Sequence, residues 1–354
     1  MATPAASGRA RERVAGIGEA AADARTLRLQ LLDEIRRVVS FDAYAWLLTD
    51  PETSVGSAPL ADVPCLSELP RLIELKYLTP VNRWTALDEP PVALLQEATG
   101  GDPSRSPLWR DLLASYGIGD IASVVFRDRF GCWGFLDLWR SGVSARFSRA
   151  EAACLADLAG PVTTALRRSQ ASAFSARSPR DAPRLGPVVL LLSPGLQVLR
   201  QTAETREYLQ ILVPPAAGLP PVPASAYNVA AQLLAVEAGV DRNPPWARVH
   251  LADGIWVSLR AARIGNEEPG LSRDIAVTIE QSSPAERLGL FARAFGLSAR
   301  ENELLGHLVT GTDTRELARR MFLSEHTVQD HLKSIFAKTS ARNRRTLLSR
   351  ALGT

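Results

Sequence analysis

The feature that most constrains the fold is a series of helix-start signals near the end of the chain. Ser298-Ala-Arg-Glu301 and Asp313-Thr-Arg-Glu316 each place a capping side chain three residues before a glutamate, as at the start of a helix. Ser324 and Asn343 can cap two further helices, because their oxygens accept from the free amides of a first helical turn. Apolar residues recur at helical spacing behind each cap. The pattern predicts four helices within residues 297–354.

The second and third of these helices are separated by a tight turn, Phe322-Leu323-Ser324. A short helix, a turn and a second helix form the helix-turn-helix motif, and the small Ala318 allows the two helices to cross closely. The third helix, near residues 325–337, is predicted to bury Val328, Leu332, Ile335 and Phe336. Its outward face then carries His326, Gln329, Asp330, Lys333 and, at its end, Lys338. Such side chains can read base edges in a major groove.

The positive charge of the chain is concentrated in the same segment. Residues 297–354 contain ten Lys or Arg and six Asp or Glu, a net charge of +4, whereas the whole chain carries +3. A local positive excess is expected where a domain meets a polyanion. The same excess is common on ordinary protein surfaces, so charge alone does not establish nucleic-acid binding.

At these residues the chain resembles the LuxR-type helix-turn-helix family. The matching positions are Leu297–Leu305, Gly311, Glu316–Lys338 and Asn343–Leu348. The resemblance covers about a sixth of the chain. It implies a four-helix DNA-binding domain that often dimerises through its last helix. The expected partners are therefore double-stranded operator or promoter DNA and a second copy of the chain, with RNA polymerase as a further partner.

The resemblance also assigns roles to single residues. The family's equivalents of Gln329, Asp330 and Lys333 approach base edges, and those of Thr327, Lys338 and Arg344 contact the DNA backbone. Arg315, His326 and Ser334 complete the DNA-binding set that we predict from the sequence.

Two positions depart from the family pattern. The glycine usual after the recognition helix is Ser340, which would carry a strain of order 1 kcal/mol if the backbone there is left-handed. Asp330 places an acid on the reading face, where phosphates repel it but a cytosine amino group can donate to it. Its alternative role is that of a helix-surface residue paired with a nearby arginine.

The upstream sequence resembles two sensor folds. Gly131–Trp139 followed by Arg146–Glu151 resembles a GAF domain, with a preceding helix from Leu27, a strand at Tyr44–Leu48 and a hairpin of Ile121–Phe126 with Cys132–Trp139. Residues 51–116 are expected to be loop-rich and mostly helical. The segments Val188–Leu192, Asp253–Leu259 and Asp274–Ile279 resemble a PAS-type sheet, with a hairpin turn at Asp253-Gly254. Both folds commonly bind small molecules or dimerise, so the resemblance implies a sensor role and an effector of unspecified identity.

The predicted fold class is thus α+β, with GAF-like and PAS-like domains before an all-α LuxR-type domain. The expected boundaries are a mobile tail over 1–24, the GAF-like domain over 25–170, a linker over 171–186, the PAS-like domain over 187–281, a connecting helix over 282–296 with Ser283 as its cap, and the helix-turn-helix domain over 297–354.

The residue inventory argues against several other chemistries. Lysine occurs only at Lys76, Lys333 and Lys338, and none follows the glycine-rich loop that a P-loop needs to bring the amine to phosphates. Upstream of the C-terminal segment there is one histidine, His250, for which a structural role is favoured over a metal or haem ligand. Cys65, Cys132 and Cys154 show no CxxC pair, and Cys132 in a strand is more often a core thiol. We expect no cofactor, no metal and no enzyme activity.

Three further expectations concern location, the tryptophans and alternative functions. The charged N-terminus and the lack of a long apolar run predict a cytoplasmic protein without a membrane partner. Trp46, Trp133 and Trp139 are expected to pack in a core, with the lining of a pocket as the alternative. The alternative functions are a signalling adaptor whose helix-turn-helix contacts protein, and, least favoured, an enzyme within residues 25–281.

Overall fold

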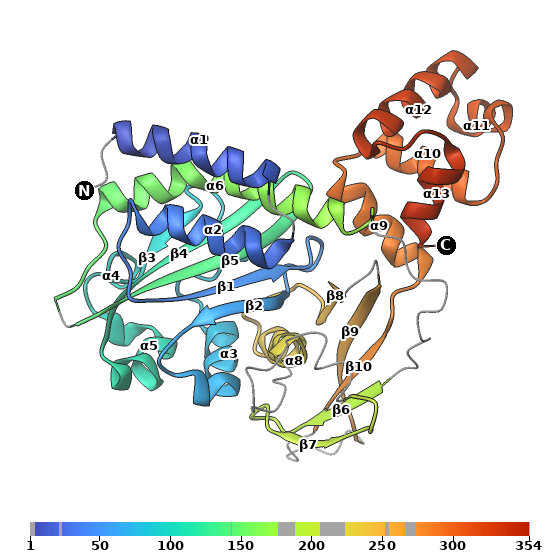
Figure 1. Ribbon diagram of the computed structural model, residues 1–354. Coiled ribbons are helices and arrows are strands. Elements are labelled where there is room, and N and C mark those ends of the chain that lie inside the picture. Colours follow the sequence, from blue (N-terminus) through green and yellow to red (C-terminus); the bar gives the residue numbers. More distant parts are fainter. Residues whose placement is uncertain are drawn as a thin grey trace. The chain divides into compact units, whose positions relative to one another are not determined.

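The chain forms two compact units in a computed structural model that describes residues 4–20, 23–142, 144–175, 188–205, 224–251, 255–265 and 274–353. The first unit comprises Met1–Leu166, Leu185–Val249 and Val257–Gln281. The second comprises Arg167–Arg184, His250–Trp256 and Ser282–Thr354. Figure 1 labels the elements of both units.

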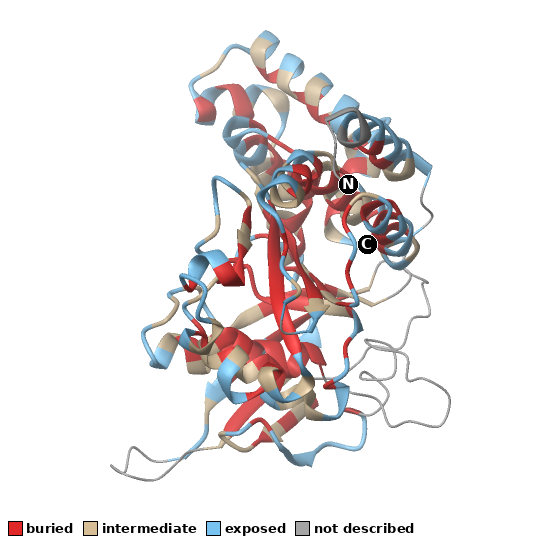
Figure 2. Ribbon diagram, turned by 90° about the vertical axis from the view of Figure 1, so that its left-hand side faces the viewer, coloured by how far each residue is buried: buried red, intermediate tan, exposed pale blue. Residues whose placement is uncertain are grey.

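The first unit contains a five-stranded antiparallel sheet of order β2-β1-β5-β4-β3. Its strands are β1 Ala43–Thr49, β2 Gly56–Asp62, β3 Val92–Leu94, β4 Ile118–Asp128 and β5 Gly131–Ser141. The predicted hairpin is confirmed as β4 and β5, which are buried along most of their length, and Figure 2 shows the sheet as a largely buried layer. The strand β2 was not predicted within residues 51–116, because Gly56 and Pro59 are unfavourable in strands other than edge strands.

Helices cover both faces of this sheet (Figure 1). One face carries α1 Pro4–Ala20, α2 Ala24–Arg36 and α6 Arg149–Ser172, and the other carries α3 Leu69–Leu78 and α5 Pro107–Asp111. Shorter elements are α4 Leu95–Ala98 and the 3-10 turns Leu66–Glu68, Pro103–Arg105 and Leu113–Tyr116. The predicted capping box at the start of α6 is present, since Ser148 and Glu151 exchange hydrogen bonds of 2.9 and 3.3 Å.

The expectation of a mobile tail over residues 1–24 is wrong for most of that segment. Residues 4–20 form α1, in which Ala10 and Val14 are fully buried. These two residues are one helical turn apart, and Gly18 approaches Ala165 of α6 so closely that a Cβ would lie 2.7 Å from it. This packing keeps the segment helical although Gly8, Gly16 and Gly18 lower its helix propensity.

A second five-stranded antiparallel sheet, of order β7-β6-β10-β9-β8, follows in the chain. Its strands are β6 Val188–Leu192, β7 Val198–Gln201, β8 Trp246–His250, β9 Trp256–Arg263 and β10 Ile275–Gln281, and α8 spans Ala224–Glu237. Counted within each sheet, the two strand orders are the same. The predicted turn at Asp253-Gly254 and most of the predicted linker lie outside the described residues, whereas residues 171 and 172 belong to α6.

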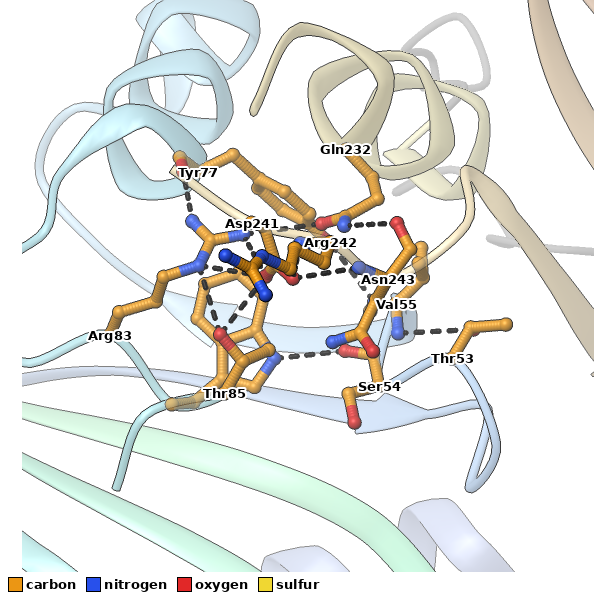
Figure 3. A network of polar contacts seen from close by, with 12 residues as sticks. Thr53, Ser54, Val55, Tyr77, Arg83, Thr85, Gln232, Asp241, Arg242 and Asn243 are labelled. Carbon is orange, nitrogen blue, oxygen red and sulfur yellow. Dashed lines mark hydrogen bonds and ion pairs between the residues drawn. The ribbon is translucent and has the colours of Figure 1, made fainter. Parts of the chain in front are cut away.

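Buried polar contacts join the two sheet-containing segments within the first unit (Figure 3). The Arg83 guanidinium lies 2.6 Å from Asp241 Oδ2, donates to Gln232 of α8 at 3.2 Å and to Thr85 at 2.9 Å. Burial acts to raise the pKa of Asp241, but hydrogen bonds from the Asn243 amide and from Arg83 lower this pKa overall. A second pair, Arg248 with Asp50 at 2.7 Å, is also buried. The two sheets are therefore parts of one compact unit.

Among its described residues, the second unit contains the end of α6 from Arg167 and five further helices: α9 Pro284–Ala294, α10 Ala299–Val309, α11 Thr314–Met321, α12 Glu325–Thr339 and α13 Arg344–Leu352. The predicted connecting helix is α9, which Ser283 and Glu286 start with a capping box. Phe174 stacks on Trp256 with ring centroids 5.0 Å apart and meets Phe291 of α9 edge-on. This aromatic cluster gives the unit an apolar core outside the last four helices.

Candidate nucleic-acid interface

The four predicted helices of the C-terminal segment are present, each with the predicted cap. Ser298 and Glu301 form a capping box, and Asp313, Ser324 and Asn343 each accept from an amide in the first turn of their helix. The helix α12 buries Val328, Leu332 and Ile335, as expected, while Phe336 is half-buried. A capped helix fixed by its inner residues presents its outer face in a defined orientation.

The outer face of α12 carries the side chains that we predict to reach base edges. His326, Gln329, Asp330 and Lys333 are all exposed, with 73% of the Lys333 side chain accessible. Asp330 lies between the two basic groups, 3.2 Å from Lys333 Nζ and 3.5 Å from His326 Nε2. Exposed ion pairs contribute about 0–1 kcal/mol, so these groups can exchange partners at little cost. Asp330 thus pairs with a lysine and lies near a histidine, whereas the alternative predicted from the sequence was a nearby arginine.

The end of α12 is held differently, by Glu301 of α10. Lys338 Nζ lies 2.6 Å from Glu301 Oε2, and the Ser334 hydroxyl lies 2.6 Å from Oε1. Burial acts to raise the pKa of Glu301, but hydrogen bonds from Lys338, Ser334 and the Ser298 amide outweigh it and lower the pKa to about 2. Two residues predicted to contact DNA therefore also hold the domain together, a role that the sequence pattern did not reveal.

The remaining predicted contact residues lie at the ends of α11, α12 and α13. Arg315 is exposed in the first turn of α11. The Thr327 hydroxyl is 2.9 Å from that of Ser324, and Arg344 donates to the Thr314 hydroxyl at 2.6 Å. Arg344 is half-buried and connects the start of α13 to that of α11. The nine predicted residues thus share one domain but belong to three helices.

Two left-handed residues flank α12. Ser340, which follows the helix, has φ +51°, so the position does require the conformation for which glycine is usual. Phe322, in the turn before the helix, has φ +54°, and its side chain is 95% exposed. The sequence places Phe322 in the turn but did not reveal its exposure. The available signal was that Phe322 lies outside the set of apolar residues that recur at helical spacing.

The comparison with known families addresses this same segment. Residues 296–351 match the family described as bacterial regulatory proteins, luxR family. The C-terminal segment is a LuxR-family regulatory domain. The match confirms the predicted LuxR resemblance for this segment and leaves the GAF-like and PAS-like interpretations upstream as predictions.

Curated relatives match over the same part of the chain. The monoamine regulon transcriptional regulator of Klebsiella aerogenes is 43% identical over 54 residues, which is 15% of this chain and 24% of that protein. The probable HTH-type transcriptional regulator GfsR of Streptomyces halstedii is 37% identical over 71 residues, 20% of this chain and 29% of that protein. The chain therefore matches only about a quarter of the length of these relatives.

A solved structure matches over a longer stretch but weakly. The crystal structure of Escherichia coli SdiA covers 97% of this chain and 96% of its own, at 13% identity and a TM-score of 0.32. A TM-score this low does not establish a shared fold for the upstream segments.

The described residues also include carboxylate, cysteine and histidine side chains outside the α12 face. Within these ranges no group of three or more His, Cys, Asp and Glu side chains is placed to hold a metal ion. The three cysteines are buried, and burial raises the pKa of Cys65 to about 11, which disfavours its thiolate. The His250 ring lies 5.0 Å from that of Trp256, a packing contact. None of the helices in the described ranges is both long and apolar enough to cross a bilayer.

Proposed function

We propose that this protein is a sequence-specific DNA-binding transcription regulator that places α12 in the major groove. The observation that carries the proposal is the polar outer face of α12, held on a capped domain of the LuxR regulatory family. An aligned pair of exposed groups, Gln329 and Lys333, can donate to purine edges, and Asp330 can accept from a cytosine amino group. The relatives' names as transcriptional regulators support the same conclusion.

Within this proposal, the residues that contact DNA divide into base-reading and backbone-contacting residues. Lys333 reads bases, since its only described acidic partner is an exposed residue of its own helix. Thr327, Arg315 and Arg344 contact the DNA backbone from the starts of three helices, where free amides and basic groups face phosphates. Lys338 adds a backbone contact while it keeps Glu301, because an ammonium has three N–H donors.

The upstream segments are proposed to control this activity as GAF-like and PAS-like modules. Their common strand order supports related folds for the two sheets. A small-molecule effector bound there, a homodimer formed through α13, and contact with RNA polymerase are the regulatory elements of the proposal. The buried Arg83–Asp241 pair supports movement of the two modules as one body, because separating them would leave a buried charge without its partner.

One observation favours the alternative of a signalling adaptor. Phe322 exposes 95% of its surface at the turn of the helix-turn-helix motif, next to the face proposed for DNA. Exposed aromatic side chains frequently serve as anchors in protein interfaces. An adaptor would lose partner binding in Phe322→Ala, whereas a DNA reader of the kind proposed would keep its DNA affinity in that variant.

The test is selection of bound sites from the genomic fragments of the source organism by the purified full chain. The proposal expects one enriched motif, with two symmetric half-sites if the protein binds as a dimer. Retardation of no genomic fragment at low salt, with or without cell extract, would contradict it.

A further inference from the structure

The described residues form a cavity in each unit, and the two cavities differ in chemistry. The one beneath the first sheet has a volume of about 50 Å³, and its mostly apolar lining includes Lys76, Asn228 and Trp139. All three tryptophans considered from sequence are buried, and Trp139 is the one that lines this cavity. A polar ligand would leave its hydrogen-bonding groups unpaired there.

The cavity of the second unit is larger and basic. It has a volume of about 340 Å³ and lies between the carboxyl-terminal ends of α6, α9 and α12. Three cations line it, Arg167 and Arg168 from α6 and Lys338 from α12, and none of its described lining residues is acidic. Hydroxyl side chains and the apolar Ala294 and Phe295 form most of the remaining lining.

Aromatic packing holds the end of α6 against α9 (Figure 1). Phe174, two residues past α6, meets Phe291 edge-on with ring centroids 5.3 Å apart and lies 6.3 Å from the Phe295 ring. Arg167 Nη1 donates to the Ala294 carbonyl oxygen at 3.5 Å. Because a guanidinium has five N–H donors, Arg167 can keep this contact and also donate into the cavity.

The end of α12 would by itself oppose an anion, because the last carbonyl groups of a helix carry partial negative charge. Arg350 of α13 offsets this charge, since it donates to the carbonyl oxygens of Thr339 and Ser340 at 2.8 and 3.3 Å. Lys338 is paired with Glu301, but 37% of its side chain is accessible and its ammonium has three N–H donors. The cavity therefore favours an anion.

Ser340 lines the same cavity from a strained backbone position. Its φ of +51° is left-handed, a conformation in which glycine is usual and serine is strained. Strained residues tend to persist where a function uses them. The exposed Ser340 hydroxyl can donate to an anion in the cavity, which a glycine at this position could not do.

We propose that this cavity binds a small organic phosphate. The phosphate group pairs with the three cations and accepts from the Ser340 hydroxyl, and the organic body packs on Ala294 and Phe295. A phosphate monoester carries a charge of about −1.5 to −2 at pH 7 and three acceptor oxygens, which suits guanidinium donors. Small-molecule sites have volumes of roughly 300–1,000 Å³, so this cavity has room for an organic body beside the phosphate.

The DNA backbone is the alternative source of a phosphate group, because Lys338 is also proposed to contact DNA. The apolar part of the lining favours a free organic phosphate, since a hydrophobic ring suits Ala294 and Phe295 better than a polar sugar–phosphate chain does. The inference thus goes beyond the proposed DNA-binding function and does not depend on it.

The test measures the affinity of the full chain for phenyl phosphate, benzoate and inorganic phosphate by ligand-observed NMR at one ionic strength. Benzoate keeps the ring but carries a single charge, and inorganic phosphate lacks the ring. Arg168→Gln removes a cation of the lining, and Ser340→Gly removes the hydroxyl while it relieves the backbone strain. The matched controls are Arg149→Gln at the exposed start of α6 and Ala337→Gly at an exposed position of α12, neither of which is among the described lining residues.

The proposal expects phenyl phosphate to bind more tightly than either other probe. Arg168→Gln should weaken its binding about fivefold, because a charge-assisted hydrogen bond is lost. Ser340→Gly should weaken it about threefold although this variant stabilises the fold, a combination that a purely structural serine would not give. Both controls should keep the wild-type affinity for phenyl phosphate, and Arg168→Gln should keep the wild-type affinity for DNA.

Equal binding of phenyl phosphate and benzoate or inorganic phosphate would overturn the proposal, as would an unchanged phenyl phosphate affinity in either Arg168→Gln or Ser340→Gly. Loss of DNA affinity in Arg168→Gln with phenyl phosphate binding retained would assign this cation to the DNA backbone and would also overturn it. The probes are measured without DNA, so a failure of DNA binding leaves this result unaffected.

Discussion

Lys338 Nζ lies 2.6 Å from Glu301 Oε2 and thereby joins the end of the recognition helix α12 to α10. The Glu301 side chain is 4% exposed and accepts from Ser334 as well. Among the residues that the structure describes, Lys333, two helical turns from the start of α12, is paired with Asp330 alone, and both side chains are exposed. Lys338 thus joins α12 to α10, whereas Lys333 is paired within its own helix.

Glu301→Gln should destabilise the C-terminal domain by about 1–3 kcal/mol at neutral pH, because the buried Glu301 carboxylate is replaced by a neutral amide that binds Lys338 and Ser334 less strongly. Hydrogen exchange of α10 and α12 amides measures the effect locally. The matched control is Glu303→Gln on the same helix, where the exposed pair with Arg300 predicts little change. Equal protection in the two variants would show that Glu301 does not hold α12.

The stabilisation by Glu301 should also depend on pH. Its pKa in the folded protein is lowered from the ordinary 4.5 to about 2, so the unfolded chain binds the proton more readily. The contribution is therefore complete above about pH 4.5 and is lost as the pH falls toward 2. The difference in stability between the wild type and Glu301→Gln should shrink across that window; a constant difference would argue against this ionised pair.

Ser340→Gly should stabilise the protein by roughly 0.5 kcal/mol, because glycine removes the cost of a left-handed serine but adds chain entropy to the unfolded state. The φ of +51° at this position is the basis of the prediction. Ala337→Gly, exposed within α12, should instead destabilise by about 0.5–1 kcal/mol. Urea unfolding of the two variants should show opposite signs, and destabilisation by both would contradict the conformational argument.

The local signals in the sequence predicted the C-terminal domain closely. The caps at Ser298, Asp313, Ser324 and Asn343 act within one helical turn, so their effect is visible in short sequence windows. The hairpin of β4 and β5 was likewise predictable from alternating apolar runs. The helix α1 was missed because its stability comes from packing on α2 and α6, which no local pattern shows.

The contacts that join distant parts of the chain could not be predicted. Arg83 and Asp241 are 158 positions apart, and Arg248 and Asp50 are 198 apart. Each residue by itself resembles a solvated surface charge, and only the fold reveals its burial. The same holds for Lys76 and Asn228, whose shared cavity depends on the placement of α8 beside the first sheet.

Arg83→Met should destabilise the first unit by about 3–5 kcal/mol, since it leaves Asp241 buried without its cation. Arg83→Met combined with Asp241→Leu should recover much of the loss, because no unpaired charge remains. Arg149→Ala, which breaks the exposed pair with Glu97, is the control and should cost less than about 1 kcal/mol. Thermal unfolding checks all three, and additive losses in the double variant would contradict a coupled pair.

The most direct test of the central claim is the affinity of the full chain for its selected DNA site across a range of salt concentrations, for the wild type, Lys333→Ala and Arg149→Ala. DNA binding through α12 predicts that log affinity falls linearly with log salt, with a slope of about −0.9 for each neutralised phosphate. Lys333→Ala should weaken binding by about 1–3 kcal/mol and relax selectivity at one base position, while Arg149→Ala leaves both unchanged. A flat salt profile, or equal losses in the two variants, would contradict the claim that α12 reads DNA.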